Sequence, residues 1–278
     1  MMMNSVRRWG VGIGLLMACQ VVLAQELVFT APPREKPEAG QKLYGPIVEH
    51  LNKLLGRKVV YEHPGNWLNY QRNMREDKYD IVFDGPHFIS WRMEHLQHEV
   101  VVKLPGHLQF FLVTNKNETE VTKTTDLVGK RICGISPPNL SSLSIIAAYQ
   151  NPVRQPVIKG VKGGMPAVLK TYMGGKKDCR ASILRSAFFK KKVKKEVQDQ
   201  LKIIYKTPKL PNQGISISKR LSPRDKTLIQ QSFMHGDGIK ATANLRRRFA
   251  GKSKSMVRAT TEEFTGHNLL LEGVIFGW

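Results

Sequence analysis

Cysteine, acidic residues and long apolar runs are all scarce in this chain. Three cysteines in 278 residues exclude a disulfide-dense scaffold. No apolar run approaches the roughly 20 residues that a membrane-spanning helix needs. Asp and Glu number 22 against 44 Lys and Arg, so the formal net charge is +22. The hydrophobic content of 41% is that of a globular protein, and the length suffices for two lobes.

Recognisable catalytic and metal-binding motifs are also missing. The sequence contains no nucleophile elbow, no P-loop and no dinucleotide-binding fingerprint. Its eight histidines form no H-x-x-x-H or HExxH pair. His95, His98 and His107 are close in sequence, and we interpret them as separate surface side chains rather than metal ligands. The sequence therefore predicts a protein with no catalytic residues, no metal and no cofactor.

The first 24 residues have the pattern of a secretory signal peptide. Arg7 and Arg8 precede an apolar stretch, and residues 22–24 (VLA) offer permitted side chains before a cleavage site at Gln25. We expect residues 1–24 to be removed on export to the periplasm. Export separates the protein from chromosomal DNA, so nucleic acid is not an expected partner despite the positive charge.

A second processing route starts from the same segment. Residues 16–19 (LMAC) are similar to a lipobox, in which Cys19 would carry a lipid anchor and become the first residue. Met17 fits that pattern poorly, and residues 21–24 extend the apolar run beyond Cys19. A lipid-anchored form at Cys19 is therefore the less favoured alternative.

The start of the mature chain alternates strands and helices. Apolar patterning predicts strands over 27–30, 59–61 and 79–83, with helices over 44–55 and 67–75 between them. Such alternation is typical of a parallel α/β sheet. Ligands bind such sheets at the carboxyl ends of the strands. This rule selects the loop around Pro32 and the residues that follow the third strand, Asp84 to His87.

A second α/β unit follows, after which the chain returns to the first unit. Strands are predicted over 110–114, 130–135, 179–184, 201–205 and 215–218, and helices over 143–149, 165–173, 193–201 and 222–234. Strand-like crossings near 112–116 and 206–214 join the two units. We therefore expect a discontinuous lobe 1, residues 25–113 and 214–278, and an inserted lobe 2, residues 114–213.

Several segments resemble the phosphonate/phosphate-binding group of periplasmic substrate-binding proteins of ABC transporters. They are residues 44–59 (YGPIVEHLNKLLGRKV), 78–86 (KYDIVFDGP), 126–132 (DLVGKRI), 136–143 (SPPNLSSL) and 163–169 (GGMPAVL). The resemblance spans about residues 27–235, and its order and spacing are more specific than any single motif. It implies an α/β type II periplasmic binding protein fold, with two lobes joined by two hinge crossings.

The chain departs from the family pattern at two places in lobe 2. The family has neighbouring Ser or Thr hydroxyls and a glycine at a helix start, where this chain has Ser141 and Ser142 followed by Leu143. Family members often have a histidine where this chain has residues 164–166 (GMP). The fold is therefore better supported than a phosphonate ligand.

Eight residues form the predicted ligand site, and each has a plainer interpretation. Hydroxyls at a helix N-terminus favour an anion but also serve as simple N-caps. An arginine after a strand binds oxyanions through two donors but is more often a solvated surface residue. The loop residues can form a tight turn with a solvated histidine, and the tyrosine at the first helix start can be a core residue. The eight are Tyr44, Asp84, Gly85, Pro86, His87, Ser141, Ser142 and Arg185.

If Cys19 leaves with the signal peptide, two cysteines remain, Cys133 and Cys179. The fold implied by the resemblance places their strands side by side, so a disulfide between them is expected. Two buried free thiols are the alternative.

The positive charge is concentrated in lobe 2. Residues 25–113 carry no net charge, residues 114–213 carry +14 and residues 214–278 carry +6. A basic lobe facing a neutral one attracts an anionic ligand, or an anionic membrane surface or partner. We therefore expect a monomeric periplasmic protein that captures a small anion and delivers it to an ABC permease. The alternative is a ligand sensor or accessory protein that acts on a membrane sensor kinase.

Overall fold

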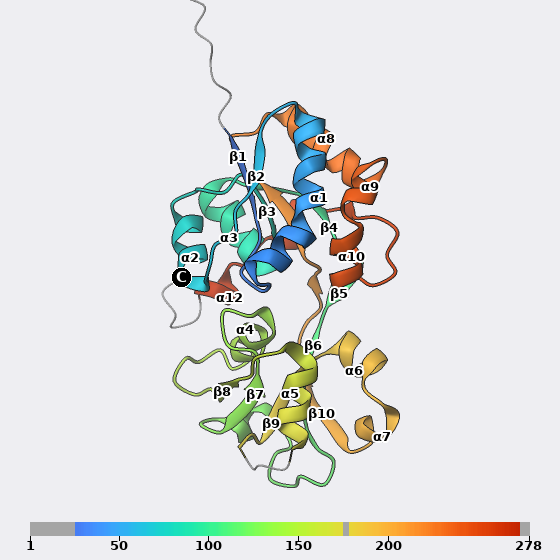
Figure 1. The fold of residues 1–278 in the computed structure, drawn as a ribbon. Helices are drawn as coiled ribbons and strands as arrows, with labels where there is room; N and C mark the ends of the chain where they lie inside the picture. The colour runs from blue at the N-terminus through green and yellow to red at the C-terminus, as the bar shows by residue number, and fades with distance from the viewer. Residues whose placement is uncertain (1–25, 175–177, 273–278) are drawn as a thin grey trace, which may run out of the picture.

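The structure is a computed structural model that describes residues 26–174 and 178–272. Figure 1 shows two α/β lobes, one above the other, joined by extended segments. The predicted signal peptide and Cys19 lie outside the described residues. Among those residues, no helix combines the length and apolar character that crossing a membrane requires.

Lobe 1 is built on a six-stranded mixed sheet in the order β13-β4-β12-β3-β1-β2. β1, β2 and β3 are parallel, and β12 runs antiparallel to both β3 and β4. The strands are β1 (Leu27–Thr30), β2 (Val59–Tyr61), β3 (Ile81–Asp84), β4 (Glu99–Lys103), β12 (Gly214–Ile217) and β13 (Val257–Arg258).

Helices cover both faces of this sheet, as a largely buried parallel sheet requires. One face carries α1 (Pro37–Leu55), α8 (Pro223–Met234) and α10 (Ala243–Phe249), with α9 (Gly238–Ala241) beside them. The other carries α2 (Trp67–Arg75), α3 (Pro86–Leu96) and α12 (Leu269–Glu272). The short α11 (Thr261–Phe264) contacts α3 and β4.

Lobe 2 has a five-stranded sheet in the order β10-β6-β9-β7-β8. Its strands are β6 (Phe110–Asn115), β7 (Arg131–Gly134), β8 (Val157–Gly160), β9 (Ala181–Arg185) and β10 (Leu201–Lys206). One face packs on α4 (Leu140–Ala147). The opposite face packs on α5 (Gly164–Met173), α6 (Ser186–Lys192) and α7 (Lys195–Gln198). A 3-10 helix, η1 (Thr124–Leu127), precedes β7.

The two crossings between the lobes form a short antiparallel ribbon, β5 (His107–Leu108) with β11 (Leu210–Pro211). The first crossing comes earlier than the sequence suggested. The segment expected as a crossing, around 112–116, belongs to β6, which pairs with β9 on one side and β10 on the other. Phe110 to Thr114 are all buried, so this apolar run occupies the centre of a sheet rather than a hinge.

Three helical expectations need correction. The first helix begins at Pro37 and not at Tyr44, because Pro37 occupies its N-terminal position and Glu38 its first turn. The expected turn after β3 is the start of α3, with Gly85 as N-cap and Pro86 at the first helical position. The expected helix over 193–201 is reduced to α7, which covers 195–198.

The last described helix connects the lobes. α12 contacts α3 of lobe 1 and α4 of lobe 2. Leu271 is fully buried in a cluster that joins residues of α2 and α3 with Leu143 of α4, and Leu270 packs against this cluster and the lobe 2 core. Within the segment 214–278 that the sequence assigned to lobe 1, α12 therefore contacts both lobes.

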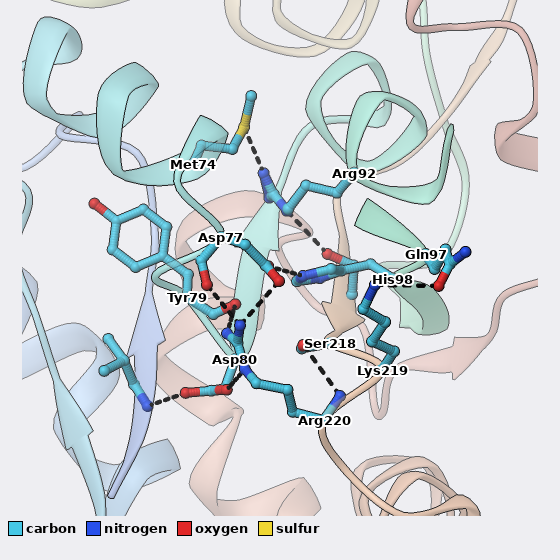
Figure 2. A network of polar contacts seen from close by, with 12 residues as sticks. Met74, Asp77, Tyr79, Asp80, Arg92, Gln97, His98, Ser218, Lys219 and Arg220 are labelled. Carbon is cyan, nitrogen blue, oxygen red and sulfur yellow. Dashed lines mark hydrogen bonds and ion pairs between the residues drawn. The ribbon is translucent and has the colours of Figure 1, made fainter. Parts of the chain in front are cut away.

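A polar network fixes the end of β3 that lies away from lobe 2 (Figure 2). Arg220 donates through Nε to Asp80 Oδ1 at 2.8 Å and through Nη1 to Asp77 Oδ2 at 2.9 Å. The other Asp80 oxygen accepts the Val28 amide at 2.8 Å. His98 Nε2 donates to Asp77 Oδ1 at 3.3 Å. These contacts tie β1, β3, the end of α3 and the β12–α8 loop together.

Candidate ligand-binding site

The parallel strands of the two mixed sheets end at edges that face each other. β3 of lobe 1 ends at Asp84, and β7 of lobe 2 ends at Gly134. His87, just after β3, donates through Nε2 to the carbonyl of Pro138, just after β7, at 3.1 Å. The edges where ligands bind in such sheets are therefore in contact across the lobe boundary.

Asp84 lies at this edge but is directed into lobe 1. Its side chain is fully buried, and Oδ2 accepts from Arg92 at 2.8 Å and from the Tyr70 hydroxyl. Oδ1 accepts the Gly85 amide at 2.6 Å. Burial raises the pKa of Asp84, while the Arg92 and Arg34 charges oppose that shift. Asp84 is thus a structural anion and not the ligand contact expected from the sequence.

Tyr44 is a core residue rather than an entrance residue. It lies within α1, is 1% exposed and packs against Phe29 and Tyr61. Burial raises the pKa of its phenol. Its hydroxyl has no hydrogen-bond partner among the described residues. This position agrees with the plainer of the two interpretations, because the helix starts two turns earlier than expected.

Ser141 and Ser142 serve the start of α4. The helix begins at Leu140, and Asn139 is its N-cap, accepting the Ser141 amide at 3.0 Å. The Ser141 hydroxyl donates to the same Asn139 oxygen at 2.7 Å, and the Ser142 hydroxyl donates to the Ile135 carbonyl. Both hydroxyl protons are therefore engaged within lobe 2. In this conformation neither serine offers a free donor to an anion.

His87 is buried, which corrects the alternative of a solvated side chain. It is 3% exposed, and burial lowers its pKa to about 3, with the Pro138 carbonyl opposing the shift. A Cβ on Gly85 would lie 2.8 Å from the His87 ring, so any larger residue there would require the ring to shift. Pro86 starts the helix. The segment after β3 therefore holds the lobe contact in place.

Arg185 keeps an uncompensated charge at the facing edge. It ends β9, next to β7, and its side chain is partly buried. Its Nε has no hydrogen-bond partner, and it makes no ion pair with any described residue. Burial lowers its pKa, and no carboxylate offsets that effect. A half-buried guanidinium without a carboxylate is a ready partner for an oxyanion.

Arg34 is a further charged group at this edge that the sequence did not select. It follows β1 in the loop opened by Pro32, and its side chain is 20% exposed. Its Nη2 lies 3.5 Å from Asp84 Oδ1. The guanidinium carbon lies 6.0 Å from the centre of the Phe83 ring and 5.5 Å from that of Phe249. The sequence had selected the Pro32 loop as a ligand loop, so Arg34, the first charged residue of that loop, could have been selected with it.

The structure also places the cysteines and histidines that the sequence analysis singled out. Cys133 and Cys179 form a disulfide with a Cα–Cα distance of 5.5 Å. Within the described part of the chain, no cluster of His, Cys, Asp and Glu suits a metal ion. His98 is not a surface residue as expected, because it is 4% exposed and bonded to Asp77. His95 pairs with Glu272 of α12 at 2.5 Å.

The sequence of this chain matches one protein family model. The family model for the phosphonate periplasmic substrate-binding proteins of ABC transporters matches residues 29–262. No curated protein sequence is significantly similar to the chain.

Solved binding proteins share the fold at low sequence identity. PhnD1 from Prochlorococcus marinus, in complex with methylphosphonate, has a TM-score of 0.64 and 15% identity, covering 89% of this chain and 97% of its own. A Xanthomonas citri protein bound to chloride has a TM-score of 0.69 and 8% identity, covering 89% and 98%. A phosphonate transporter binding protein from Pseudomonas aeruginosa has a TM-score of 0.57 and 15% identity, covering 89% and 84%. The two-lobed type II fold predicted from the sequence is thereby confirmed.

Proposed function

The chain belongs to the family of periplasmic substrate-binding proteins of phosphonate ABC transporters, and we propose that it binds a phosphonate- or phosphate-like oxyanion between its lobes and delivers it to a permease. The family implies a small ligand, a permease partner and a periplasmic location. Lobe closure over a ligand is the usual action of such two-lobed proteins.

Arg185 is the observation that carries the oxyanion assignment. It lies at the carboxyl end of β9, on the edge that faces lobe 1. Its guanidinium is partly buried and has no carboxylate partner among the described residues. A bound oxyanion would supply the missing negative charge through two parallel hydrogen bonds.

The charge of lobe 2 supports the same assignment. Residues 114–213 carry a net charge of +14, against none for residues 25–113. A lobe of one sign raises the local concentration of anions and their rate of association. We expect the association rate to fall steeply as ionic strength rises.

The proposal also includes predictions about export, oligomeric state and contact with a membrane surface. Residues 1–24 act as a signal peptide and are removed before Gln25, with a lipid anchor at Cys19 as the alternative. An intact mass that begins at Gln25 would exclude the anchor. The protein acts as a monomer without catalysing a reaction, and its basic lobe can rest on an anionic membrane surface.

A thermal-shift screen tests the ligand class. Methylphosphonate, phosphate, phosphite, sulfonates and carboxylates are each added to the mature protein. A ligand at 100 times its Kd stabilises the protein by about 2.7 kcal/mol, which raises Tm by roughly 5–10 °C for a chain of this size. The absence of a shift with every anion would refute the proposal.

A variant pair links any shift to Arg185. Arg185→Gln removes the charge and is expected to abolish most of the ligand-induced shift. Arg180→Gln is the control, since Arg180 precedes the same strand at its other end, where Glu118 and Glu120 pair with it. An equal loss in both variants would mean that the effect is general and not due to the site.

Ligand sensing is the second candidate role for the same site. The absence of the family's histidine from residues 164–166 favours it, because a site that lacks this donor departs from the transport members. Copurification distinguishes the roles. A permease recovered with the liganded protein supports transport, and a sensor kinase supports signalling.

A further inference from the structure

Arg34 of lobe 1 and Arg185 of lobe 2 each lie at or after the end of a strand on the edge that meets the other lobe. Arg34 follows β1, which is parallel and adjacent to β3, and Arg185 ends β9, which is parallel and adjacent to β7. The contact between His87 and Pro138 joins the ends of β3 and β7. Both arginines therefore lie on the two edges that this contact brings together.

Asp84 does not neutralise Arg34 fully. The Asp84 carboxylate is already bonded to Arg92 at 2.8 Å and to the Tyr70 hydroxyl through Oδ2. Arg34 is 3.5 Å from Oδ1, which also accepts the Gly85 amide at 2.6 Å. The longer contact leaves donors of Arg34 available to another acceptor.

The charge balance at the facing edges is positive. Arg34, Arg92 and Arg185 contribute three positive charges, and Asp84 contributes one negative charge. The nearby Glu35 is paired with Arg248 at 3.2 Å and does not change this balance. Two positive charges are left for a ligand, one on each lobe.

The aromatic surroundings of Arg34 hold its guanidinium and shield it from water. Its carbon lies 6.0 Å from the centre of Phe83 and 5.5 Å from that of Phe249, and four-fifths of the side chain is buried. Cation–π contacts of this kind favour the guanidinium at this position, and lysine lacks the planar set of donors that arginine presents. A charge in such a partly dry place interacts more strongly with an anion than one in water.

We propose that Arg34 is a specificity-determining ligand contact, which acts opposite Arg185 so that the site prefers oxyanions with two negative charges. This inference rests on the proposed function, because it assumes that an oxyanion binds between the lobes. To the proposed function this inference adds Arg34 as a ligand contact from lobe 1 and a ligand charge of minus two. A singly charged anion of the same shape leaves one arginine uncompensated.

Calorimetric titration with a matched pair of ligands tests the charge preference. Methylphosphonate and methanesulfonate have similar tetrahedral heads, and at pH 8.5 the first is mostly doubly charged while the second is singly charged. The wild-type protein is expected to bind methylphosphonate about ten- to hundredfold more tightly, as for one charged hydrogen-bonded contact. Arg34→Gln is expected to lose this preference and keep methanesulfonate affinity within about threefold.

Arg57→Gln is the matched control. Arg57 follows the opposite end of α1, and its Nη1 lies 3.6 Å from Asp225 with 27% of the side chain exposed. This variant should keep the wild-type preference. If Arg34→Gln does not fold, Arg34→Lys keeps the charge but loses the planar donors, and a reduced preference is expected.

The outcomes separate this inference from the proposed function. If the wild-type protein binds neither ligand, and no other anion in the screen, the proposed function fails. If it binds methylphosphonate more tightly and Arg34→Gln keeps that preference, the role of Arg34 is refuted while oxyanion binding stands. Equal wild-type affinity for the two ligands would also refute the preference for two charges.

Discussion

His87 of lobe 1 donates a hydrogen bond from Nε2 to the Pro138 carbonyl of lobe 2 at 3.1 Å. The acceptor is a carbonyl, so Nε2 must carry the proton, and Nδ1 is buried without a partner. The imidazole is therefore neutral while the two lobes are in contact in this way. Its surroundings agree, because Arg34, Arg92 and His267 all disfavour a second positive charge there.

We expect closure of the lobes to weaken in acid because of His87. Its pKa is lowered from 6.5 to about 3, chiefly by burial. Opening returns the ring to water, where it binds a proton near its ordinary pKa. The closed form binds fewer protons, so it is favoured above about pH 6.5 and loses up to about tenfold in its equilibrium constant per pH unit below it.

Small-angle scattering measures this shift without a ligand. The radius of gyration of the wild-type protein should rise between pH 7.5 and pH 5.5. His87→Gln can still donate to Pro138 but cannot titrate, so its radius should stay constant over this range. The exposed His235 provides the control, and His235→Gln should behave like wild type. An unchanged pH response in His87→Gln would show that another group governs closure.

Removal of Arg92 is expected to destabilise lobe 1 strongly. Arg92 is 1% exposed and is the closest charged partner of the fully buried Asp84. A buried charge that loses its partner costs about 3–5 kcal/mol, which corresponds to a fall in Tm of roughly 10 °C. Melting of Arg92→Met measures the loss. Arg92→Met combined with Asp84→Asn should recover part of it, and no recovery would mean that Arg92 acts by packing alone.

The sequence predicted where the main strands and the loops after them lie, but not the directions of the side chains in those loops. Alternation of apolar strands and helices located β1, β3, β7 and β9, and the rule for strand ends located the loops after them. Sequence patterning could not show that Asp84 turns inward, because its partner Arg92 lies in α3, and the start of α3 was expected to be a tight turn. The inward direction of Asp84 is decided by a contact eight residues away.

Helix starts account for the other misplaced residues. Tyr44 was expected at a helix start because the apolar spacing of the predicted helix begins there, yet α1 begins at Pro37. Ser141 and Ser142 were expected as anion donors, and Asn139 takes the capping role instead. Asn139, Ser141 and Ser142 can all cap a helix, and the sequence alone does not show which of them does so in the folded protein. Arg185 was placed correctly at a strand end, since a five-residue buried strand leaves little freedom in its last position.

The disulfide is expected to contribute substantially to the stability of lobe 2. Cys133 and Cys179 close a loop of 46 residues, for which the chain-entropy model gives about 4 kcal/mol. Replacement of both by serine should lower Tm by roughly 10 °C, with reduction of the wild-type protein giving a similar fall. In the mature chain that starts at Gln25, thiol labelling after denaturation without reductant should detect no free cysteine. Two labelled cysteines would contradict the bond.

Arg220 is expected to be the key residue of the network at the far end of β3 (Figure 2). It bonds to the Asp77 carbonyl at 2.7 Å as well as to the Asp77 and Asp80 carboxylates, and these contacts need a planar group with several donors. Burial raises the pKa of Asp77, but the hydrogen bond from His98 and the Arg220 charge lower it overall.

Urea unfolding separates the charge of Arg220 from its geometry. Arg220→Ala should lower the free energy of unfolding by about 2 kcal/mol, because Asp80 is almost buried and loses its cation. Arg220→Lys keeps the charge but cannot bridge both carboxylates, so it should recover less than half of that loss. Arg224→Ala, an exposed position in the first turn of α8, should change stability by less than about 0.5 kcal/mol. Full recovery with lysine would mean that charge alone holds this end of the sheet, and the bridging geometry would then be irrelevant to stability.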